Sequence, residues 1–244
     1  LAVAVGDFDN DGFADFFLNG FESCILLRNQ GDGTFTDATD EQLRTLRKFG
    51  AGACFIDIDG DGGLDLFVGA YIRFSKKDLV PEAPPRTFYK SPFDFMADSS
   101  SLWLNNMDGS WTDVSQSSGI GSLAGAAMGV LCGDLDQDGD SDILVANDEM
   151  QNYLYLNDGT GVFTEAGFSM GLAVDCQGNA QGSMGIDCGD LDNDGRPEII
   201  VTSYEGELMT LYSLTQQGVY KDVTRGTRIG EGTLPHVTWG CSLA

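Results

Sequence analysis

The sequence is poor in the residues that most catalytic and nucleic-acid-binding sites require. Its 244 residues contain one histidine, His236, and 13 Lys and Arg against 38 Asp and Glu, which gives a formal net charge of −25. No nucleophile motif surrounds His236, and no glycine-rich phosphate loop is present. The negative charge opposes contact with nucleic acid or anionic membranes. We therefore predict a protein that is not an enzyme and does not bind nucleic acid.

Long apolar segments are also missing. No apolar stretch reaches the roughly 18 residues of a membrane span, and no segment shows sustained helical periodicity.

The six cysteines form no Cys-x-x-Cys pair and no zinc spacing. Cys54, Cys132, Cys188 and Cys241 lie in or near expected first strands, where small buried thiols are the simplest interpretation. A disulfide between Cys176 and Cys188, which flank a glycine-rich segment, is the alternative for that pair.

What the sequence does contain is one nine-residue pattern, Asp-x-Asp-x-Asp-Gly-x-x-Asp/Glu, in four copies. Carboxylates at positions 1, 3, 5 and 9 surround a glycine at position 6, where a sharp turn folds the oxygens around one cation. The side chain at position 7 varies, so we expect only its backbone carbonyl to be a ligand. The expected metal ligands are Asp7, Asp9, Asp11, Phe13 and Asp15; Asp57, Asp59, Asp61, Gly63 and Asp65; Asp134, Asp136, Asp138, Asp140 and Asp142; and Asp190, Asp192, Asp194, Arg196 and Glu198.

Oxygen ligands of this kind favour calcium. Magnesium requires tighter octahedral geometry, and zinc or copper would call for His and Cys, which these loops lack. The loop resembles an EF-hand loop but is shorter, because an EF-hand ends in a bidentate Glu at position 12 and lies between helices. Asp-Gly segments are also ordinary turns, but four copies with their acids in the same register argue against that interpretation. We predict four Ca²⁺ ions, one in each loop.

The loops recur within a larger repeat. Their first acids stand at positions 7, 57, 134 and 190, and each loop lies between a small, apolar run and a strand-like run such as residues 16–18 or 199–201. Two further strand-like runs complete each unit, as at residues 26–29 and 35–37 in the first. Four short strands in each unit predict an all-β fold, a β-propeller with blades of four antiparallel strands. Each metal loop then joins the first strand to the second at one rim.

These residues carry a family resemblance that covers the whole chain. The loops resemble the FG-GAP or VCBS repeats of the integrin α-subunit propeller. More narrowly, residues 128–130, 147–148, 152–157 and 178–185 resemble the cartilage acidic protein family, whose members often end in an ASPIC/UnbV domain. Residues 234–240 are similar to that family's approach to a further calcium loop. The resemblance implies a seven-bladed, secreted, calcium-binding propeller concerned with adhesion or matrix contacts. It does not imply a catalytic site.

The domain organisation follows from the repeats. One propeller region spans residues 1–244, with repeats at about 1–50, 51–127, 128–183 and 184–238 and the start of another at 239–244. Both ends fall within a blade, so we expect the four repeats to form an arc of a seven-bladed ring. Closure as a four-bladed propeller is the alternative. We expect an extracellular or other extracytoplasmic location.

The second repeat carries an insert between its second and third strands, at residues 73–99. It holds four of the six prolines of the chain, together with clustered bases and aromatic residues. Such residues are enriched at interfaces, so the insert is a candidate surface for a protein partner, and a loop that folds over its own rim is the equal alternative. We predict a binding or structural module. The alternatives are an accessory subunit docked on a larger assembly, a carbohydrate-binding lectin and a polysaccharide lyase.

Overall fold

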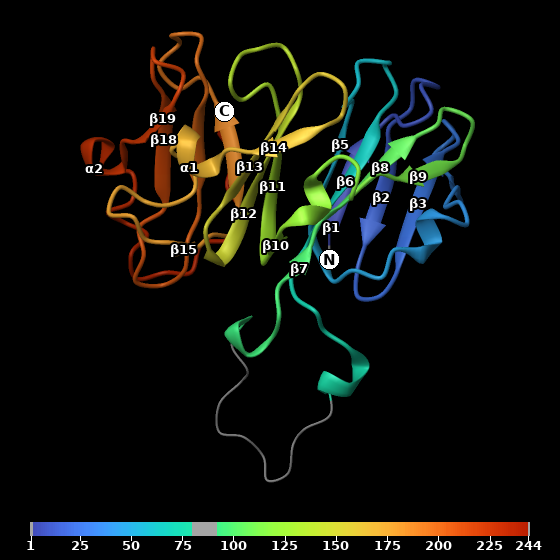
Figure 1. Cartoon of the computed structure of the whole chain (residues 1–244), viewed down its shortest axis with the longest axis horizontal. Coiled ribbons are helices and arrows are strands. Elements are labelled where there is room, and N and C mark those ends of the chain that lie inside the picture. Colours follow the sequence, from blue (N-terminus) through green and yellow to red (C-terminus); the bar gives the residue numbers. More distant parts are fainter. Residues whose placement is uncertain (1, 80–91, 244) are drawn as a thin grey trace.

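The computed structural model describes residues 2–79 and 92–243, which fold into four antiparallel sheets that lie side by side as blades of a β-propeller (Figure 1). Blade 1 contains β1 (Ala2–Gly6), β2 (Asp15–Asn19), β3 (Cys24–Asn29) and β4 (Phe35–Asp37). Blade 2 contains β5 (Gly50–Ile56), β6 (Asp65–Ala70), β8 (Ser101–Asn105) and β9 (Trp111–Asp113). Blade 3 contains β11 (Ala127–Gly133), β12 (Asp142–Met150), β13 (Tyr153–Asn157) and β14 (Phe163–Glu165). Blade 4 contains β16 (Ile186–Gly189), β17 (Glu198–Val201), β18 (Thr210–Leu214) and β19 (Tyr220–Asp222).

The remaining elements are short. Strand β7 (Asp98–Ser99) pairs with β10 (Ala124–Gly125), and β15 (Gln181–Gly182) pairs with the end of β12. The helical turns are η1 (Leu43–Thr45), η2 (Lys76–Leu79), η3 (Pro92–Asp94), η4 (Ile120–Ser122), α1 (Gly167–Met170) and α2 (Thr224–Thr227). Within residues 2–79 and 92–243, no helix has the length or apolar content needed to span a membrane.

The blades stack face to face, so the core is divided into three clusters, each between two neighbouring sheets. One cluster joins blades 1 and 2 and includes Phe17 and Leu66, a second joins blades 2 and 3, and a third joins blades 3 and 4. A blade that packs on both faces needs strands that are apolar on both faces. Strand β6 meets this condition, because all six of its residues are buried. These observations confirm the predicted four-stranded blades; the number of blades in a complete ring stays a prediction.

The first strands approach one another closely, and glycine allows that approach. A Cβ atom on Gly52 would lie 2.5 Å from the Val130 side chain, and one on Gly129 would lie 2.4 Å from the Met184 carbonyl oxygen. Such distances are far below ordinary van der Waals contact. Small residues in the runs before each loop therefore allow adjacent blades to meet at their inner edges.

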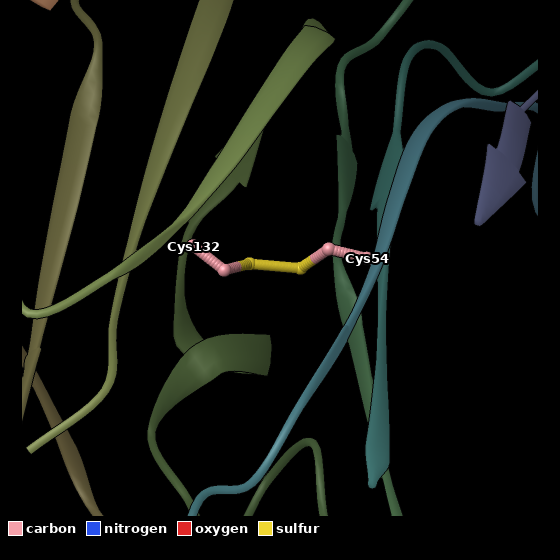
Figure 2. Close-up of a disulfide and its surroundings, with 2 residues drawn as sticks. All are labelled: Cys54 and Cys132. Atoms are coloured by element: carbon pink, nitrogen blue, oxygen red, sulfur yellow. A yellow bond between two sulfur atoms is a disulfide. The ribbon is translucent and has the colours of Figure 1, made fainter. Parts of the chain in front are cut away.

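One pair of first strands is linked covalently. Cys54 of β5 and Cys132 of β11 form a disulfide between blades 2 and 3, with their Cα atoms 6.8 Å apart (Figure 2). The prediction of buried thiols was therefore wrong for these two residues. The alternative disulfide between Cys176 and Cys188 was also wrong, because both are free cysteines. The bonded residues are 78 positions apart in sequence, so only the folded stacking of the blades brings them together.

The two rims of the propeller carry different structures. The loops that join the first strand of each blade to the second lie at one rim, and the insert of blade 2 extends from the other (Figure 1). The two ends of the insert are joined by an isolated bridge between Ile72 and Ala97 and by a hydrogen bond of 2.7 Å from the Arg73 N–H to the Met96 carbonyl.

An aromatic cluster holds the insert against the rim. Phe74 packs against Phe21 of blade 1, Phe49 of the segment between blades 1 and 2, and Phe95, with ring centroids 5.4 to 5.9 Å apart. Tyr71 packs against Phe49 and donates a hydrogen bond of 2.6 Å to Asp148 of blade 3. The described ends of the insert therefore fold over their own rim, as one of the two alternatives stated. Residues 80–91, which hold most of its prolines and part of its basic and aromatic residues, lie outside the described residues.

Candidate metal centres

The acid at position 1 organises each nine-residue loop by accepting backbone hydrogen bonds. In the first loop, Asp7 accepts from the N–H groups of Asp11 and Gly12 at 3.0 and 2.8 Å. In the fourth loop, Asp190 accepts from the equivalent residues at 3.0 and 2.9 Å. In the second and third loops, the position 1 carboxylate likewise accepts from the glycine at position 6. This arrangement wraps the backbone around one carboxylate.

The turn requires two backbone positions in the left-handed region. The glycine at position 6 has a φ between 84° and 102° in the four loops, as its identity predicts. Position 4 also has a positive φ, and there the residues are Asn10, Gly60, Gln137 and Asn193. Position 4 was not among the predicted site residues. Three of its four residues are Asn or Gly, the types that tolerate this conformation best, which is a signal that could have been used.

The acid at position 5 closes the second half of the loop. Its carboxylate accepts a hydrogen bond from the position 7 N–H at 2.7 to 3.0 Å in all four loops. The side chain at position 7 is therefore not needed to form the turn. In the fourth loop, however, the Arg196 side chain also contacts Asp194 and donates to the Leu214 carbonyl at 2.9 Å. The Arg196 side chain therefore has contacts of its own within the fourth loop.

The acid at position 9 is buried, and each of its two carboxylate oxygens accepts a hydrogen bond. Asp65 accepts from the Ile58 N–H at 3.1 Å and from the Asn105 N–H at 2.8 Å, and Asp15 and Asp142 accept from the corresponding groups of their own blades. Glu198 accepts from the Leu191 N–H and from the Ser213 hydroxyl. Burial raises the pKa of Asp65 to about 6, against the lowering effect of its two backbone hydrogen bonds. Burial raises the pKa of Asp142 to about 6 in the same way.

Three carboxylates of each loop converge. In every loop there is a set of three side chains whose oxygens lie within 4.8 Å of one another: Asp7, Asp9 and Asp15; Asp57, Asp59 and Asp61; Asp134, Asp136 and Asp142; and Asp190, Asp192 and Asp194. Positions 1 and 3 belong to all four sets, and the third member comes from position 9 or position 5. The other predicted carboxylate ligands, which are Asp11, Asp65, Asp138 and Glu198, lie outside these sets. At position 7 the contacts described above involve the N–H group and, at Arg196, the side chain, but not the carbonyl.

The donor atoms in these sets suit a hard divalent cation. All are carboxylate oxygens. In the first loop, Asp9 Oδ1 is buried and has no hydrogen-bond partner among residues 2–79 and 92–243. An unpaired buried acceptor is costly, and a cation in the first loop would satisfy it. Burial raises the pKa of Asp136 in the third loop, and the nearby Asp138 charge raises it further. Such crowding of carboxylates is relieved when a cation binds.

A guanidinium contacts two carboxylates of the first loop. Arg28 of β3 lies 2.5 Å from Asp9 Oδ2 and 3.0 Å from Asp11 Oδ2, and both aspartates raise its pKa. The equivalent residues of blades 2 and 3 are Leu104 and Leu156, which carry no charge. The first loop thus contains a basic side chain, whereas no ion pair among the described residues involves the acids of the second or third loop.

The family of the chain follows from these repeats. The family described as FG-GAP-like repeat matches residues 2–68, 95–145 and 134–201, and the matched segments contain all four nine-residue loops. The chain belongs to the FG-GAP-like repeat family. This match confirms the FG-GAP resemblance, whereas the closer similarity to the cartilage acidic protein family stays a prediction. Among curated proteins, no significant match was found.

Two solved structures are similar in part to this FG-GAP chain. One is an Agrocybe aegerita lectin described as recognising non-reducing terminal N-acetylglucosamine, with 18% identity, a TM-score of 0.46, and coverage of 90% of this chain and 50% of the lectin. The other is an exotype rhamnogalacturonan lyase, with 13% identity, a TM-score of 0.39, and coverage of 90% of this chain and 48% of the lyase. This chain therefore spans about half the length of each.

Proposed function

We propose that this FG-GAP propeller region is a calcium-binding module that acts outside the cytoplasm, in which one rim binds Ca²⁺ and the opposite rim binds a protein partner. The convergence of three carboxylates in each of four equivalent loops is the observation that carries the calcium proposal. The oxygen-only donor set favours Ca²⁺ over zinc or copper. The residues that would hold the ions are the predicted ligands at positions 1, 3, 5 and 9 and the carbonyl at position 7.

The metal would act structurally. When bound, Ca²⁺ supplies positive charge that offsets carboxylate repulsion within a nine-residue turn. The chain's own hydrogen bonds hold the loop backbone in the conformation that brings the carboxylates together, as at Asp7 and Gly12. The disulfide between Cys54 and Cys132 is consistent with an extracytoplasmic location, because such bonds persist mainly in oxidising compartments.

Calcium stoichiometry tests this proposal. Purified protein should contain four Ca²⁺ ions by elemental analysis after dialysis against a low calcium concentration. Asp134→Ala or Asp138→Ala should each remove one ion, because each substitution deletes a predicted ligand of the third loop. Asp158→Ala is a matched control, since that residue is exposed and lies in a different turn, where it accepts from Thr160. A wild-type protein without calcium, or equal calcium in all variants, would contradict the proposal.

The protein-binding surface is proposed at the insert rim. Phe93 and Met96 are 70% and 67% exposed, on a segment that the aromatic cluster fixes in place. Large exposed apolar side chains on an anchored loop are typical of binding surfaces. If this protein is instead an accessory subunit of a larger assembly, it would dock on that assembly through the same surface.

The insert proposal is best tested without disturbing its anchor. Replacing Phe93 and Met96 by Ser should weaken association with a partner isolated by co-purification, while the melting temperature changes little. Phe168→Ser, at a side chain 63% exposed on blade 3, is the matched control. Undiminished association of the insert variant, measured by surface plasmon resonance, would rule out this surface.

Carbohydrate binding remains the alternative, and one cavity favours it. A pocket of about 380 Å³ at blade 4 is lined by polar side chains that include Asp175, Gln181, Glu207 and Arg225. Hydroxyl-rich ligands are recognised by such donors and acceptors. Binding on a glycan array that Arg225→Ala abolishes would support this alternative, and unsaturated sugar products would indicate a lyase instead.

A further inference from the structure

Neighbouring calcium loops of this propeller are joined directly by side-chain hydrogen bonds. In the first loop, the Asn10 amide donates to the Gly62 carbonyl of the second loop at 3.0 Å. In the third loop, the Gln137 amide donates to the Gly195 carbonyl of the fourth loop at 2.7 Å. In both cases the donor stands at position 4 of one loop and the acceptor at position 6 of the next. The same contact is therefore built twice from different residues.

The donor is placed within the coordination loop itself. Position 4 lies between two predicted ligands, so Asn10 separates Asp9 from Asp11. The φ of Asn10 is 56° and that of Gln137 is 67°, in the left-handed region that the turn requires. Because this conformation is costly for a residue other than glycine, a hydrogen bond that fixes the side chain helps to hold the turn. Its loss should loosen the carboxylates on both sides.

The acceptor is also part of a coordination loop. The Gly62 N–H donates to Asp57 at 3.0 Å, and the Gly63 N–H, in the same peptide unit as the Gly62 carbonyl, donates to Asp61 at 2.7 Å. In the fourth loop, the Gly195 N–H donates to Asp190 at 2.9 Å. Ordering of these carboxylates around a cation thus orders the carbonyl that receives the neighbouring side chain. Continuous hydrogen bonds connect one set of ligands to the next.

The junction between the second and third loops differs. Position 4 of the second loop is Gly60, which has no side chain to reach the third loop. A second kind of contact is present at all three junctions, where a residue of the following blade donates to the position 2 carbonyl. These donors are Asn105 to Phe8, Asn157 to Ile58, and Tyr220 to Leu135, at 2.8 to 2.9 Å. The position 4 bond therefore distinguishes loops 1 and 2, and loops 3 and 4, as pairs.

We propose that the four loops bind calcium as two coupled pairs, with Asn10 and Gln137 as the positioning residues that transmit the coupling. The proposal rests on the calcium-binding function proposed above. Occupation of one loop should raise the affinity of its pair partner, and coupling of this kind is reciprocal. One neutral hydrogen bond at an exposed site corresponds to an effect of about two- to fivefold in affinity.

The glycines at position 6 provide a reporter for each loop. In protein labelled with isotopic nitrogen at glycine, the amide signals of Gly12, Gly62, Gly139 and Gly195 can be followed by NMR during a calcium titration. The titration begins at the lowest calcium concentration at which circular dichroism shows folded protein. Asp61→Asn, which impairs the second loop, should raise the calcium midpoint of Gly12 by about two- to fivefold. It should leave the midpoint of Gly195 unchanged.

Two matched variants separate coupling from local damage. Asn10→Gly reproduces the residue found at Gly60, so it keeps the positive φ and removes only the amide. Asn10→Gly should raise the calcium midpoint of Gly62 to that of an uncoupled loop. In the double variant Asn10→Gly/Asp61→Asn, the calcium midpoint of Gly12 should then equal that in Asn10→Gly alone. Asn193→Gly is the same substitution at position 4 of the fourth loop, where φ is 59° and the side chain makes no hydrogen bond among the described residues. It should leave the midpoints of the other loops unchanged.

The outcomes distinguish this proposal from the calcium function. Four glycine signals that respond to calcium with midpoints unaffected by Asp61→Asn and by Asn10→Gly would overturn the coupling and leave calcium binding intact. Equal effects of Asn10→Gly and Asn193→Gly on neighbouring loops would also overturn it. Glycine signals that do not respond to calcium at all would overturn both.

Discussion

Loss of the disulfide between blades 2 and 3 should lower stability substantially. The bond joins Cys54 to Cys132, residues 78 positions apart in sequence, and so closes a long loop in the unfolded chain. A cross-link restricts the unfolded state more as the enclosed loop lengthens. For a separation of this size the chain-entropy relation gives about 4.5 kcal/mol at 25 °C, and measured values for native disulfides are commonly about 2–4 kcal/mol.

The double variant Cys54→Ala/Cys132→Ala should therefore have a free energy of unfolding lower by about 2–4.5 kcal/mol. At about 2–4 °C for each kcal/mol in a chain of this length, the melting temperature should fall by roughly 4–18 °C. Urea denaturation and calorimetry in saturating calcium measure these changes. Thiol titration of the denatured wild type, without reductant, should find the four free cysteines that the structure contains.

The matched control is Cys176→Ala/Cys188→Ala, which removes the two cysteines of the rejected alternative pairing. The free energy of unfolding of this control should remain near that of the wild type. Reductant should lower the stability of the control and of the wild type by the same amount. If the control variant loses the larger share of stability, or if six thiols titrate in the wild type, the assigned disulfide is wrong.

Three further predictions concern the first loop, the buried acids and the core. Arg28→Leu should tighten calcium binding by the first loop about two- to fivefold, measured as the calcium midpoint of the Gly12 amide signal. The reason is that leucine, which stands at the equivalent place in blades 2 and 3, does not compete with calcium for the carboxylates. Weaker calcium binding by this variant would contradict the prediction. Burial raises the pKa of Asp65 to about 6, so this carboxyl binds a proton more readily in the folded state than in the unfolded state. In chelator, the melting temperature should therefore rise as the pH falls through 6 toward 4, and in saturating calcium the trend should reverse. A melting temperature that rises with increasing pH in chelator would show that burial does not raise the pKa of the position 9 acids. Leu66→Ala, at a fully buried side chain between blades 1 and 2, should cost about 2–5 kcal/mol in urea denaturation, whereas Leu191→Ala, at a side chain 44% exposed, should cost far less; similar losses would contradict the packing.

The strands and loops were predictable because their signals are local. The pattern of each candidate metal loop lies within nine consecutive residues. The alternation of apolar runs with glycine turns predicts each strand to within a few residues of its observed bounds. The run 26–29, for example, lies inside β3 (Cys24–Asn29). Convergence of the position 1 and position 3 carboxylates also follows from the pattern alone, as for Asp57 and Asp59.

What the sequence did not predict depends on contacts between segments that are not adjacent in the sequence, either in different blades or in different strands of one blade. The partners of Cys54 and Asn10 lie 78 and 52 positions away, and no nearby residue indicates either contact. The place of Arg28 beside the first loop follows from the pairing of β3 with β2, which brings a third-strand side chain next to a loop on the other side of the second strand. The recurrent asparagine that ends the third strand was visible in sequence, but its role at Asn105 required the neighbouring carbonyl of Phe8.

Sequence reasoning also treated the insert as one unit, whereas its described residues serve different purposes. Phe74 and Phe95 pack in the aromatic cluster that fixes the insert to the rim, while Phe93 is largely exposed. Composition alone does not separate an anchoring aromatic residue from an exposed one, because both raise the same count. Only the positions of Phe21 and Phe49 on neighbouring segments make the distinction.

The central claim is that calcium stabilises this FG-GAP propeller, and the most direct test is thermal unfolding with and without chelator. At about 1 mM Ca²⁺ and loop dissociation constants of roughly 10⁻⁴ to 10⁻³ M, each proposed site would contribute on the order of 1 kcal/mol. Four sites together would contribute several kcal/mol, comparable with the net stability of a domain. We expect chelation to lower the melting temperature by roughly 10 °C, calcium to restore it fully and magnesium to restore it poorly. A melting curve unmoved by chelator, together with no calcium by elemental analysis, would contradict the account.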